Sequence, residues 1–490
     1  MMNPLFLTDG YKTGHHQQYP KGTTKVYSNF TPRSNKYAPT GCDKVVVFGP
    51  QMVMKQIHEA FEKEFFSRPK SEVINEIREE LSMYLNTPYD TTHFEKLHDL
   101  GYLPIAVKSL KEGTLAPIKV PVLTIYNTHP DFYWVTNYLE TILSNLLWKP
   151  MTSATIAHSY RKVLTKWQQK TDKERSWFID WQGHDFSMRG MDSVDAVISS
   201  GLGHATSFSG SDSLPVIYGA RKYYDAKGFV VGSVPATEHS VMCAGSKERE
   251  IDTFRRLLET YPTGILSVVS DTWDLWKVCT EHVVTLKEEI MSRDGKLVIR
   301  PDSGDPVDIL CGSIVTPIWD GEKYLPEYKG VIELLWDIFG GTINEQGYKV
   351  LDPHIGAIYG DSITIPVAEE ICKRLEAKGF ASTNVVLGIG SFTYQYNTRD
   401  TFGFAMKATY VEIDGEGQNI FKNPITDDGT KKSATGLLCV KTDMDGNYTL
   451  IDNVTPVAEQ TGALQTIYKD GKFEHAITFE EIRENVKSNL

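Results

Sequence analysis

Hydrophobic and polar positions follow one pattern in the middle of this chain and another at its two ends. Between residues 151 and 395, short apolar runs recur, each followed by a polar or glycine cluster and usually by a helical pattern. Their spacing is mostly about 30 residues, which is the size of a βα unit. The strands are predicted at 177–181, 204–208, 229–231, 265–269, 297–299, 355–359 and 384–387. Seven such units predict an irregular (β/α) barrel whose carboxyl-end loops hold a site.

The two ends of the chain have a mixed texture instead. Before residue 151, helical patterns at 51–66 and 134–148 flank a strand meander at 103–126. After residue 395, alternating runs turn at Asp-Gly pairs, a strong hairpin signal. The fold class is therefore predicted as α/β, with a barrel domain at 151–395 and a discontinuous α+β domain built from both chain ends, 1–150 and 396–490.

Composition and charge narrow the class of protein. The formal net charge is -12, which argues against a broad nucleic-acid footprint. The six cysteines have no CxxC spacing, which fits reduced thiols and argues against a structural zinc site. The first residues lack a signal-peptide pattern, and no run approaches the ~20 apolar residues of a membrane span. We therefore expect a cytoplasmic protein with no nucleic-acid partner and no membrane partner.

The loops that follow the predicted strands contain only a few kinds of side chain that could bind a substrate or react with it. The stretch KLVIRPDSGDP, residues 296–306, places Arg300, Asp302 and Asp305 after a buried strand. The tips carry no lysine for a Schiff base, and the chain has no HExxH and no Walker A sequence. Carboxylates can bind ribose hydroxyls or Mg²⁺, glycine-rich loops expose N–H groups to phosphate, and arginine clamps phosphate oxygens. Together these groups suggest a phosphorylated sugar as substrate.

Several separated motifs occur in one order along nearly the whole chain: TDGYKTGHHQQYP, HDFSMRG, FSGSDS, SVPATEHS, SVVSDTWD, IRPDSGDP, GDS and TRD. In this set the chain resembles the nicotinamide phosphoribosyltransferase family of type II phosphoribosyltransferases. The resemblance implies a homodimer with active sites at the subunit interface. It also implies that nicotinamide and phosphoribosyl pyrophosphate give nicotinamide mononucleotide and pyrophosphate, with Mg²⁺ as cofactor. ATP is implied as a co-substrate, coupled through a phosphohistidine in NAD salvage.

The resemblance assigns a base site. Phe186 and the Tyr11 of a partner subunit would stack on the pyridine ring. Asp212 would accept from the carboxamide –NH₂ and repel a nicotinate carboxylate. Arg189 and Arg300 match arginines near the ring and the pyrophosphate. From the residues alone, Phe186 could equally be core, Asp212 a helix N-cap and Arg189 a solvated side chain.

The resemblance also assigns a phosphoribosyl site. Asp302 would bind the ribose hydroxyls, and four loop residues would hold the 5′-phosphate: Gly360, Asp361, Gly390 and Ser391. Further contacts to phosphoribosyl pyrophosphate are implied for Arg33, Ser267, Arg300, Arg399, Lys407 and Lys422. The chain departs from the family where Gly356 replaces an arginine of vertebrate members and where Ser391 interrupts a glycine run. The Mg²⁺ ligands are left open.

His239 is the residue that the resemblance makes catalytic, together with Asp271 and Asp302. A neutral imidazole can take a phosphoryl group from ATP when its second nitrogen is oriented, and Asp271 is the candidate for that role. His184 resembles a second histidine of the site. A lone histidine is more often structural. The alternatives are nicotinate phosphoribosyltransferase, against which Asp212 argues, and a catalytically silent binding protein on the same scaffold.

Overall fold

The computed structural model describes residues 2–39, 41–314, 325–422 and 434–489. Its contacts divide the chain into two compact units. The barrel unit comprises residues 157–217 and 228–396, and the terminal unit comprises 1–156, 218–227 and 397–490. Helix α6 (Glu140–Thr171) belongs in part to each. Among the described residues, none of the helices combines the length and the apolar character needed to span a lipid bilayer.

The barrel unit is built on a parallel sheet with the strand order β7-β6-β13-β12-β9-β8. These strands are β6 (Gly183–Asp185), β7 (Gly210–Ser211), β8 (Thr263–Val269), β9 (Asp294–Arg300), β12 (Ile355–Tyr359) and β13 (Val385–Ile389). Isolated parallel bridges join Gly210 to Gly232 and Ala236 to Ser267, so the segment between β7 and β8 touches both edge strands. The sheet therefore curls into an irregular barrel, and the predicted fold class is confirmed.

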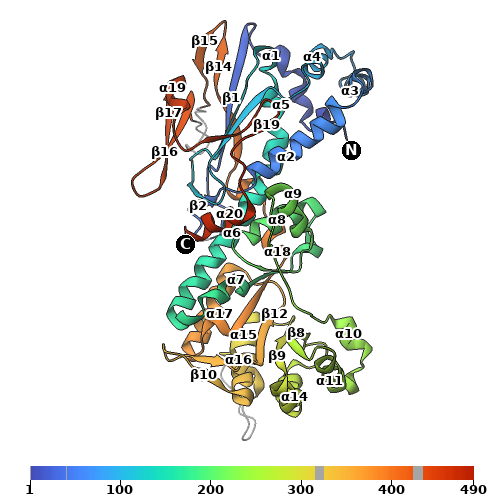
Figure 1. The fold of residues 1–490 in the computed structure, drawn as a ribbon, viewed down its shortest axis with the longest axis vertical. Coiled ribbons are helices and arrows are strands. Elements are labelled where there is room, and N and C mark those ends of the chain that lie inside the picture. Colours follow the sequence, from blue (N-terminus) through green and yellow to red (C-terminus); the bar gives the residue numbers. More distant parts are fainter. Residues whose placement is uncertain (1, 40, 315–324, 423–433, 490) are drawn as a thin grey trace. The chain divides into compact units, whose positions relative to one another are not determined.

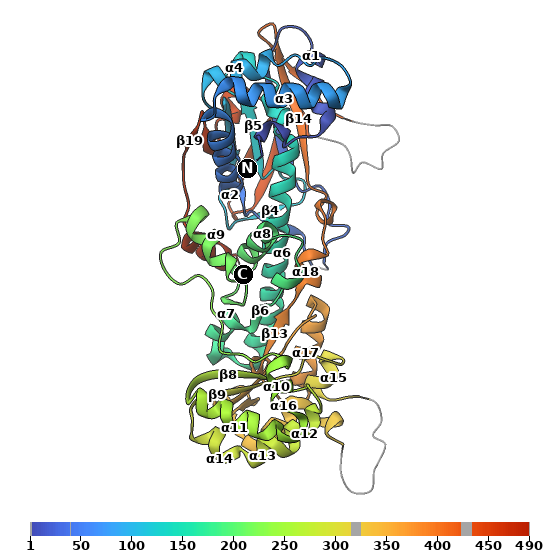
Figure 2. The same ribbon diagram turned by 90° about the vertical axis from the view of Figure 1, so that its right-hand side faces the viewer.

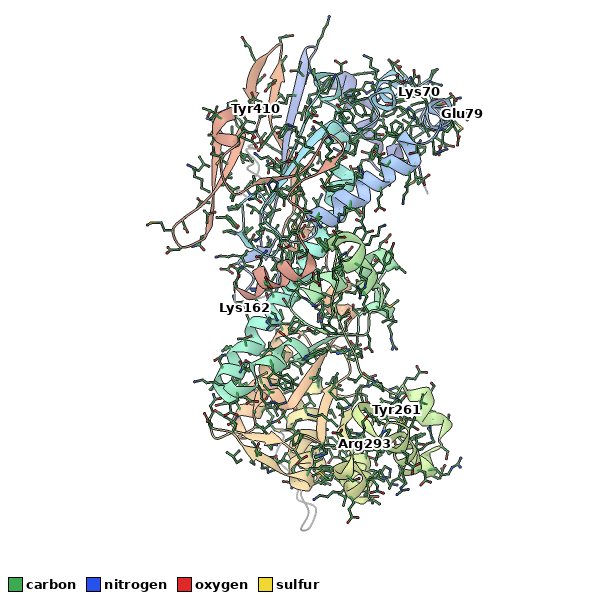
Figure 3. All side chains as sticks on the ribbon, in the orientation of Figure 1. Lys70, Glu79, Lys162, Tyr261, Arg293 and Tyr410 are labelled. Atoms are coloured by element: carbon green, nitrogen blue, oxygen red, sulfur yellow. The ribbon has the colours of Figure 1, made fainter. Side chains whose placement is uncertain are left out.

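Helices follow the strands and lie along the outside of the sheet (Figures 1 and 2). They include α8 (Val194–Ala205), α10 (His239–Ala244), α11 (Glu250–Thr260), α14 (Lys287–Ser292), α15 (Pro306–Cys311), α16 (Pro326–Phe339) and α17 (Ile365–Ala377). Helices α11 and α14 lie beside β8 and β9 in both views. Arg293, directly before β9, is joined to the residues directly before β8, because its Nε donates to the Tyr261 carbonyl at 3.0 Å. Figure 3 labels both residues.

Three of the seven strand predictions are wrong in position. Residues 177–181 are helical, and the strand begins only at Gly183. Residues 204–208 include the end of α8, ahead of the two-residue strand β7. Residues 229–231 form no strand, only an extended approach to the bridge at Gly232. Short apolar runs do not separate a strand from the buried face of a helix, which explains the first two errors.

The terminal unit contains a seven-stranded sheet with the order β15-β14-β1-β5-β3-β18-β19. Its long strands are β1 (Thr23–Thr31) and β14 (Ala405–Ile413), which pair antiparallel. Strand β3 (Ile105–Ser109) pairs with β18 (Gln465–Lys469). The remaining strands are β5 (Leu123–Asn127), β15 (Glu416–Asn419) and β19 (Lys472–Phe473). Both chain ends thus share one sheet, as predicted (Figure 1).

Helices of the terminal unit include α2 (Pro50–Phe61), α3 (Lys70–Leu85), α4 (Thr92–Leu100), α19 (Pro456–Glu459) and α20 (Phe479–Lys487), and α9 (Pro215–Tyr224) belongs to it from residue 218 onward. Buried polar groups connect several of them. Lys108 Nζ lies 2.9 Å from Glu459 Oε1, with both side chains almost fully buried. Glu112 accepts from the backbone N–H groups of Gly49 and Gln51, at 2.8 and 2.7 Å, and from the Tyr224 hydroxyl at 2.9 Å.

Candidate functional site

The carboxyl ends of the barrel strands gather the polar side chains that the sequence singled out. Parallel strands place their carboxyl ends at one edge of a sheet, so the loops that follow them converge there. Twelve predicted site residues belong to this unit: Phe186, Arg189, Asp212, His239, Ser267, Asp271, Arg300, Asp302, Gly360, Asp361, Gly390 and Ser391. The other five, Tyr11, Arg33, Arg399, Lys407 and Lys422, belong to the terminal unit.

A cavity of about 360 Å³ lies within the barrel unit. Its lining includes Phe186, Asp212, Ser267 and Arg300 from the predicted set, together with His184. The rings of His184 and Phe186 are 4.5 Å apart, centroid to centroid, and are tilted by 35°. Arg189 is exposed and does not line the cavity. The cavity therefore combines an aromatic wall with a carboxylate and a guanidinium.

Asp212 is held as a carboxylate by two neighbours. His184 Nε2 lies 3.0 Å from Asp212 Oδ1, and the Ser233 hydroxyl donates to the same oxygen. Burial acts to raise the pKa of Asp212, but the hydrogen bonds from His184 and Ser233 outweigh it, so the pKa lies below its ordinary value. A carboxylate at the cavity wall can accept from an amide –NH₂ and disfavours an anionic ring substituent.

Arg300 reaches the cavity from the end of β9. Its guanidinium donates to the Thr237 carbonyl. Burial lowers the pKa of Arg300, and Asp302, Asp212 and Asp271 oppose that shift. Arg300 Nε and Ser267 Oγ are buried and find no hydrogen-bond partner among the described residues. Because buried polar atoms are normally paired, these atoms are available to a ligand.

Asp271 and Asp302 form a carboxylate pair after β8 and β9. The Asp302 N–H donates to Asp271 Oδ2 at 2.8 Å, and the Ser303 hydroxyl donates to the same oxygen at 2.5 Å. Asp271 Oδ1 is buried and has no partner within the described part of the chain. Burial raises the pKa of Asp302; Arg300 opposes the shift and Asp271 adds to it.

The loops after β12 and β13 approach these carboxylates closely. A Cβ added at Gly360 would lie 2.4 Å from Asp302 Oδ1. One added at Gly390 would lie 1.7 Å from Asp361 Oδ1. Both positions therefore favour glycine, and the Gly360 N–H is already paired, because it donates to the Pro301 carbonyl at 3.0 Å. Ser391 opens helix α18 (Ser391–Gln395) directly after this turn.

His239 is the first residue of α10 and is half exposed. Its Nδ1 lies 3.1 Å from Thr272 Oγ1, and its Nε2 lies 3.7 Å from Asp302 Oδ2. Asp271, the predicted orienting group, instead receives the bonds from Asp302 and Ser303. The contacts that orient the imidazole are thus those of Thr272 and Asp302.

Sequence reasoning missed two hydroxyls of this site. Thr272 contacts His239, and Ser233 contacts Asp212. Both lie within motifs that carry the resemblance, SVVSDTWD and the GSVPATEHS run. The available signal was a hydroxyl residue at a predicted strand tip, but sequence spacing does not reveal which carboxylate or imidazole it meets.

The terminal unit carries the second predicted set. Tyr11 lies in the short helix Gly10–Gly14 and is 66% exposed. Arg33 Nε donates to the Gly403 carbonyl at 2.9 Å. Burial is the largest cause that lowers the pKa of Lys407, and Glu140 opposes it. Three other predicted cations are near enough to lower this pKa further: Arg33, Lys422 and Arg399. A cluster of cations with this mutual repulsion is suited to a multiply charged anion.

Solved structures share this fold. The crystal structure of nicotinate-nucleotide pyrophosphorylase from Pyrococcus furiosus matches with a TM-score of 0.58 and 15% identity, over 99% of this chain and 95% of that one. The structure of human nicotinic acid phosphoribosyltransferase matches with a TM-score of 0.55 and 16% identity, over 98% and 93% of the two chains. The fold is therefore of the class to which these two proteins belong.

Sequence comparison then identifies the family. Residues 181–471 match the nicotinate phosphoribosyltransferase (NAPRTase) family, and residues 3–97 match the N-terminal domain of nicotinamide phosphoribosyltransferase. A nicotinamide phosphoribosyltransferase from Acinetobacter baylyi is 49% identical over 100% of this chain and 98% of its own length. Another, from Xanthomonas campestris pv. campestris, is 32% identical over 98% and 97%. The chain belongs to the nicotinate phosphoribosyltransferase family, which confirms the resemblance seen in the motifs.

Proposed function

We propose that this chain is a nicotinamide phosphoribosyltransferase, which joins nicotinamide to phosphoribosyl pyrophosphate and releases pyrophosphate. Full-length similarity to relatives of that name supports the reaction class. The observation that carries the choice of base is Asp212, kept ionised by His184 and Ser233 at the wall of the cavity. A carboxylate there accepts from the amide of nicotinamide and repels nicotinate.

The base would lie against Phe186 in this cavity. Offset stacking of an aromatic side chain on the pyridine ring adds about 0.5–1.5 kcal/mol beyond burial. The exposed Tyr11 of a second copy would cover the other face, so the proposed enzyme is a homodimer with shared sites. Arg300, with its buried Nε unpaired among the described residues, would bind between the ring and the diphosphate.

The phosphoribosyl group would lie beyond the base, at the strand tips. Asp302 would accept from the ribose hydroxyls, and the loops that follow Gly360 and Gly390 would hold the 5′-phosphate through backbone N–H groups. The cations Arg33, Arg399, Lys407 and Lys422 would meet the pyrophosphate across the dimer. Positioning and charge neutralisation suffice for this reaction, because the bond to carbon forms through an oxocarbenium-like state without a protein nucleophile.

The carboxylates fit a Mg²⁺ ion that arrives with the diphosphate. Mg²⁺ is usually held by one or two carboxylates plus substrate phosphates. Asp271 Oδ1, buried without a partner in the described chain, is one carboxylate oxygen for the ion, and the neighbouring carboxylate of Asp302 would be a second ligand. No group of three or more metal-binding side chains occurs among the described residues, consistent with shared coordination. The ion would supply charge neutralisation to the departing pyrophosphate.

ATP coupling through His239 is the second part of the proposal. If Thr272 accepts a hydrogen bond from Nδ1–H, the lone pair on Nε2 is directed away from Thr272 and can attack a γ-phosphoryl group. A phosphohistidine would then lie beside Asp302 and the ribose site. The enzyme would act in NAD salvage, in the cytoplasm.

The test is direct. Purified protein is incubated with nicotinamide, phosphoribosyl pyrophosphate and Mg²⁺, with and without ATP, and nicotinamide mononucleotide is quantified. We expect product, at least tenfold faster with nicotinamide than with equimolar nicotinate, and more product when ATP is present. Asp302→Ala serves as the inactive control. Product from nicotinate alone would replace this proposal with nicotinate phosphoribosyltransferase, and no product from either base would favour a silent binding protein.

A further inference from the structure

A second cavity, of about 420 Å³, lies wholly within the terminal unit. It is surrounded by the short helix α1 (His15–Gln18), the start of β1, the amino end of α4 and residues 130–134. Helices α1 and α4 lie at the same end of this unit in both views (Figures 1 and 2). The described lining holds two carboxylates, Asp90 and Asp131, with one lysine, Lys96, and no arginine. The proposed reaction uses none of these side chains.

Two stacked imidazoles form one wall of this cavity. The rings of His16 and His93 are 3.7 Å apart, centroid to centroid, with 15° between their planes. Burial lowers the pKa of both residues, that of His93 to about 3, so both rings are neutral at pH 7. His16 Nδ1 lies 3.1 Å from the Thr13 carbonyl oxygen, which can only accept, so the ring proton is on Nδ1. The lone pair on His16 Nε2 has no donor among the described residues and is an acceptor for a ligand.

The hydroxyl groups of the lining donate their protons to the protein itself. Three of them donate to backbone carbonyl groups and one donates to Asp90 Oδ1. They are those of Thr23, Thr24, Thr92 and Tyr133, over 2.6, 3.4, 2.6 and 2.5 Å. A hydroxyl group has one proton and two lone pairs, so each of these oxygens can only accept from a ligand.

Asp90 and Asp131 add charged acceptors. Asp90 Oδ1 accepts from the hydroxyl and the backbone N–H of Thr92, at 2.6 and 2.9 Å, and these hydrogen bonds lower the pKa of Asp90. Asp90 Oδ2 and the Asp131 carboxylate have no partner in the described parts of the chain. The donors of the lining are Lys96, the Gln17 amide and the indole N–H of Trp134, which is buried. Acceptors therefore outnumber donors, and negative charge exceeds positive charge.

This set of groups favours an organic cation over a metal ion. No group of three or more metal-binding side chains occurs among the described residues. Imidazole lone pairs lie in the plane of the ring, so two nearly parallel rings do not direct them at one ion. An ammonium or guanidinium group instead brings several N–H donors to the acceptors, and aromatic faces such as that of Tyr133 attract such cations.

We propose that this cavity binds a small alkyl cation, whose ammonium or guanidinium groups are held by Asp90, Asp131 and His16 Nε2. The carbon chain of the ligand packs against the aromatic rings of the lining. A dication suits the site best, because the two carboxylates exceed the single lysine by one charge and each can hold one cationic group. The proposal concerns binding alone and does not rest on the proposed reaction.

Binding is measured by titration calorimetry on the full-length protein at about 0.1 M salt, where charges more than ~10 Å apart are screened. The probes are 1,4-diaminobutane, 4-guanidinobutylamine and the neutral butane-1,4-diol, which have the same four-carbon chain. We expect Kd for at least one dication to be tenfold or more below that of the diol. The two dications decide between ammonium and guanidinium. Equal Kd values for all three probes, or no binding of either dication, would overturn the proposal.

Variants locate the site. Asp90→Asn and Asp131→Asn should each raise Kd for the preferred dication at least fivefold and leave that of the diol unchanged. Lys96→Met should lower Kd for the dication, because it removes the one lysine of the described lining; a gain in affinity cannot result from misfolding. Asp99→Asn, which removes an exposed carboxylate of the same helix α4, is the matched control. Dication binding that is unchanged in the double variant Asp90→Asn/Asp131→Asn, or that is weakened as much by Asp99→Asn, would contradict the assignment.

Discussion

Two buried carboxylates of the terminal unit and two charged groups of the barrel unit differ in how completely their polar atoms are paired. In the terminal unit, Glu459 meets Lys108 and also accepts from Gln460 Nε2 at 2.6 Å. Glu112 has three donors. In the barrel unit, Asp271 Oδ1 and Arg300 Nε lie buried with no partner in the described chain. The carboxylates of the terminal unit have their hydrogen-bond partners within the folded chain. The unpaired atoms of the barrel unit can still form hydrogen bonds to a ligand.

The difference separates structural charges from functional ones more clearly than burial does. A fully satisfied buried network stabilises one conformation, and removing one member leaves another group unpaired. An unsatisfied group lowers stability unless something binds to it, so it persists where binding is the purpose. Substitutions at Glu112 and Glu459 should therefore change the free energy of unfolding, and those at the unpaired charged groups of the barrel unit should change ligand affinity and turnover.

The largest effect is expected at the buried ion pair. Glu459→Leu leaves Lys108 charged and buried with the Glu459 main-chain carbonyl as its remaining acceptor, at 2.9 Å. Removing one partner of a buried pair costs about 3–5 kcal/mol of unfolding free energy. Chemical denaturation monitored by fluorescence would measure it. The double variant Lys108→Met/Glu459→Leu should recover most of the loss, and a double variant as unstable as the single one would contradict this account.

Glu112 should make the stability of the terminal unit depend on pH. Burial raises its pKa to about 7 from 4.5, against the hydrogen bonds from Gln51, Gly49 and Tyr224. Well below pH 4.5, Glu112 is protonated in both the folded and the unfolded chain. As the pH rises toward 7, Glu112 loses its proton in the unfolded chain but keeps it in the folded chain. Stability therefore falls across this window, by about 3 kcal/mol in full.

The comparison is with Glu112→Gln, which cannot titrate. The amide loses one acceptor, which adds an offset that does not vary with pH. The difference in unfolding free energy between the two proteins, measured from pH 4.5 to 8, should move in favour of the variant as the pH rises. A constant difference would show that Glu112 titrates alike in both states.

The long barrel strands and the sheet shared by both chain ends could be predicted from the sequence, because apolar runs such as 265–269 and 355–359 are bounded by polar turns. The short strands β6 and β7 could not, since two or three residues carry no periodicity. The strand-tip carboxylates could be named as candidates in the same way. The close approach of Lys296 to Gly356 depends on strand register, and the contact between Thr272 and His239 depends on loop conformation. Sequence spacing encodes neither.

At the cavity, Asp212→Ser should affect affinity and not folding. A hydrogen bond to a charged group contributes about 1.5–3 kcal/mol, so KM for nicotinamide should rise roughly 10- to 100-fold, and discrimination against nicotinate should weaken. Steady-state kinetics with both bases measures this. Asp212→Asn keeps the shape of the side chain and loses its charge. Its KM for nicotinamide should lie between that of the unaltered protein and that of Asp212→Ser. An unchanged ratio of kcat/KM for the two bases in Asp212→Ser would remove Asp212 as the selectivity residue.

The smallest effect is expected at Thr272, which orients His239 and does not itself react. Thr272→Val keeps the shape and removes the hydroxyl 3.1 Å from Nδ1, so it should cost about 1 kcal/mol, or roughly fivefold in the rate of ATP-dependent turnover. Thr272→Ser should restore the rate. Because the hydroxyl is the hydrogen-bond partner of His239 Nδ1, the His239 resonances of ¹⁵N-histidine-labelled protein should shift in Thr272→Val and not in Thr272→Ser. If the resonances of all three proteins coincide, Thr272 does not set the tautomer, whatever the rates are.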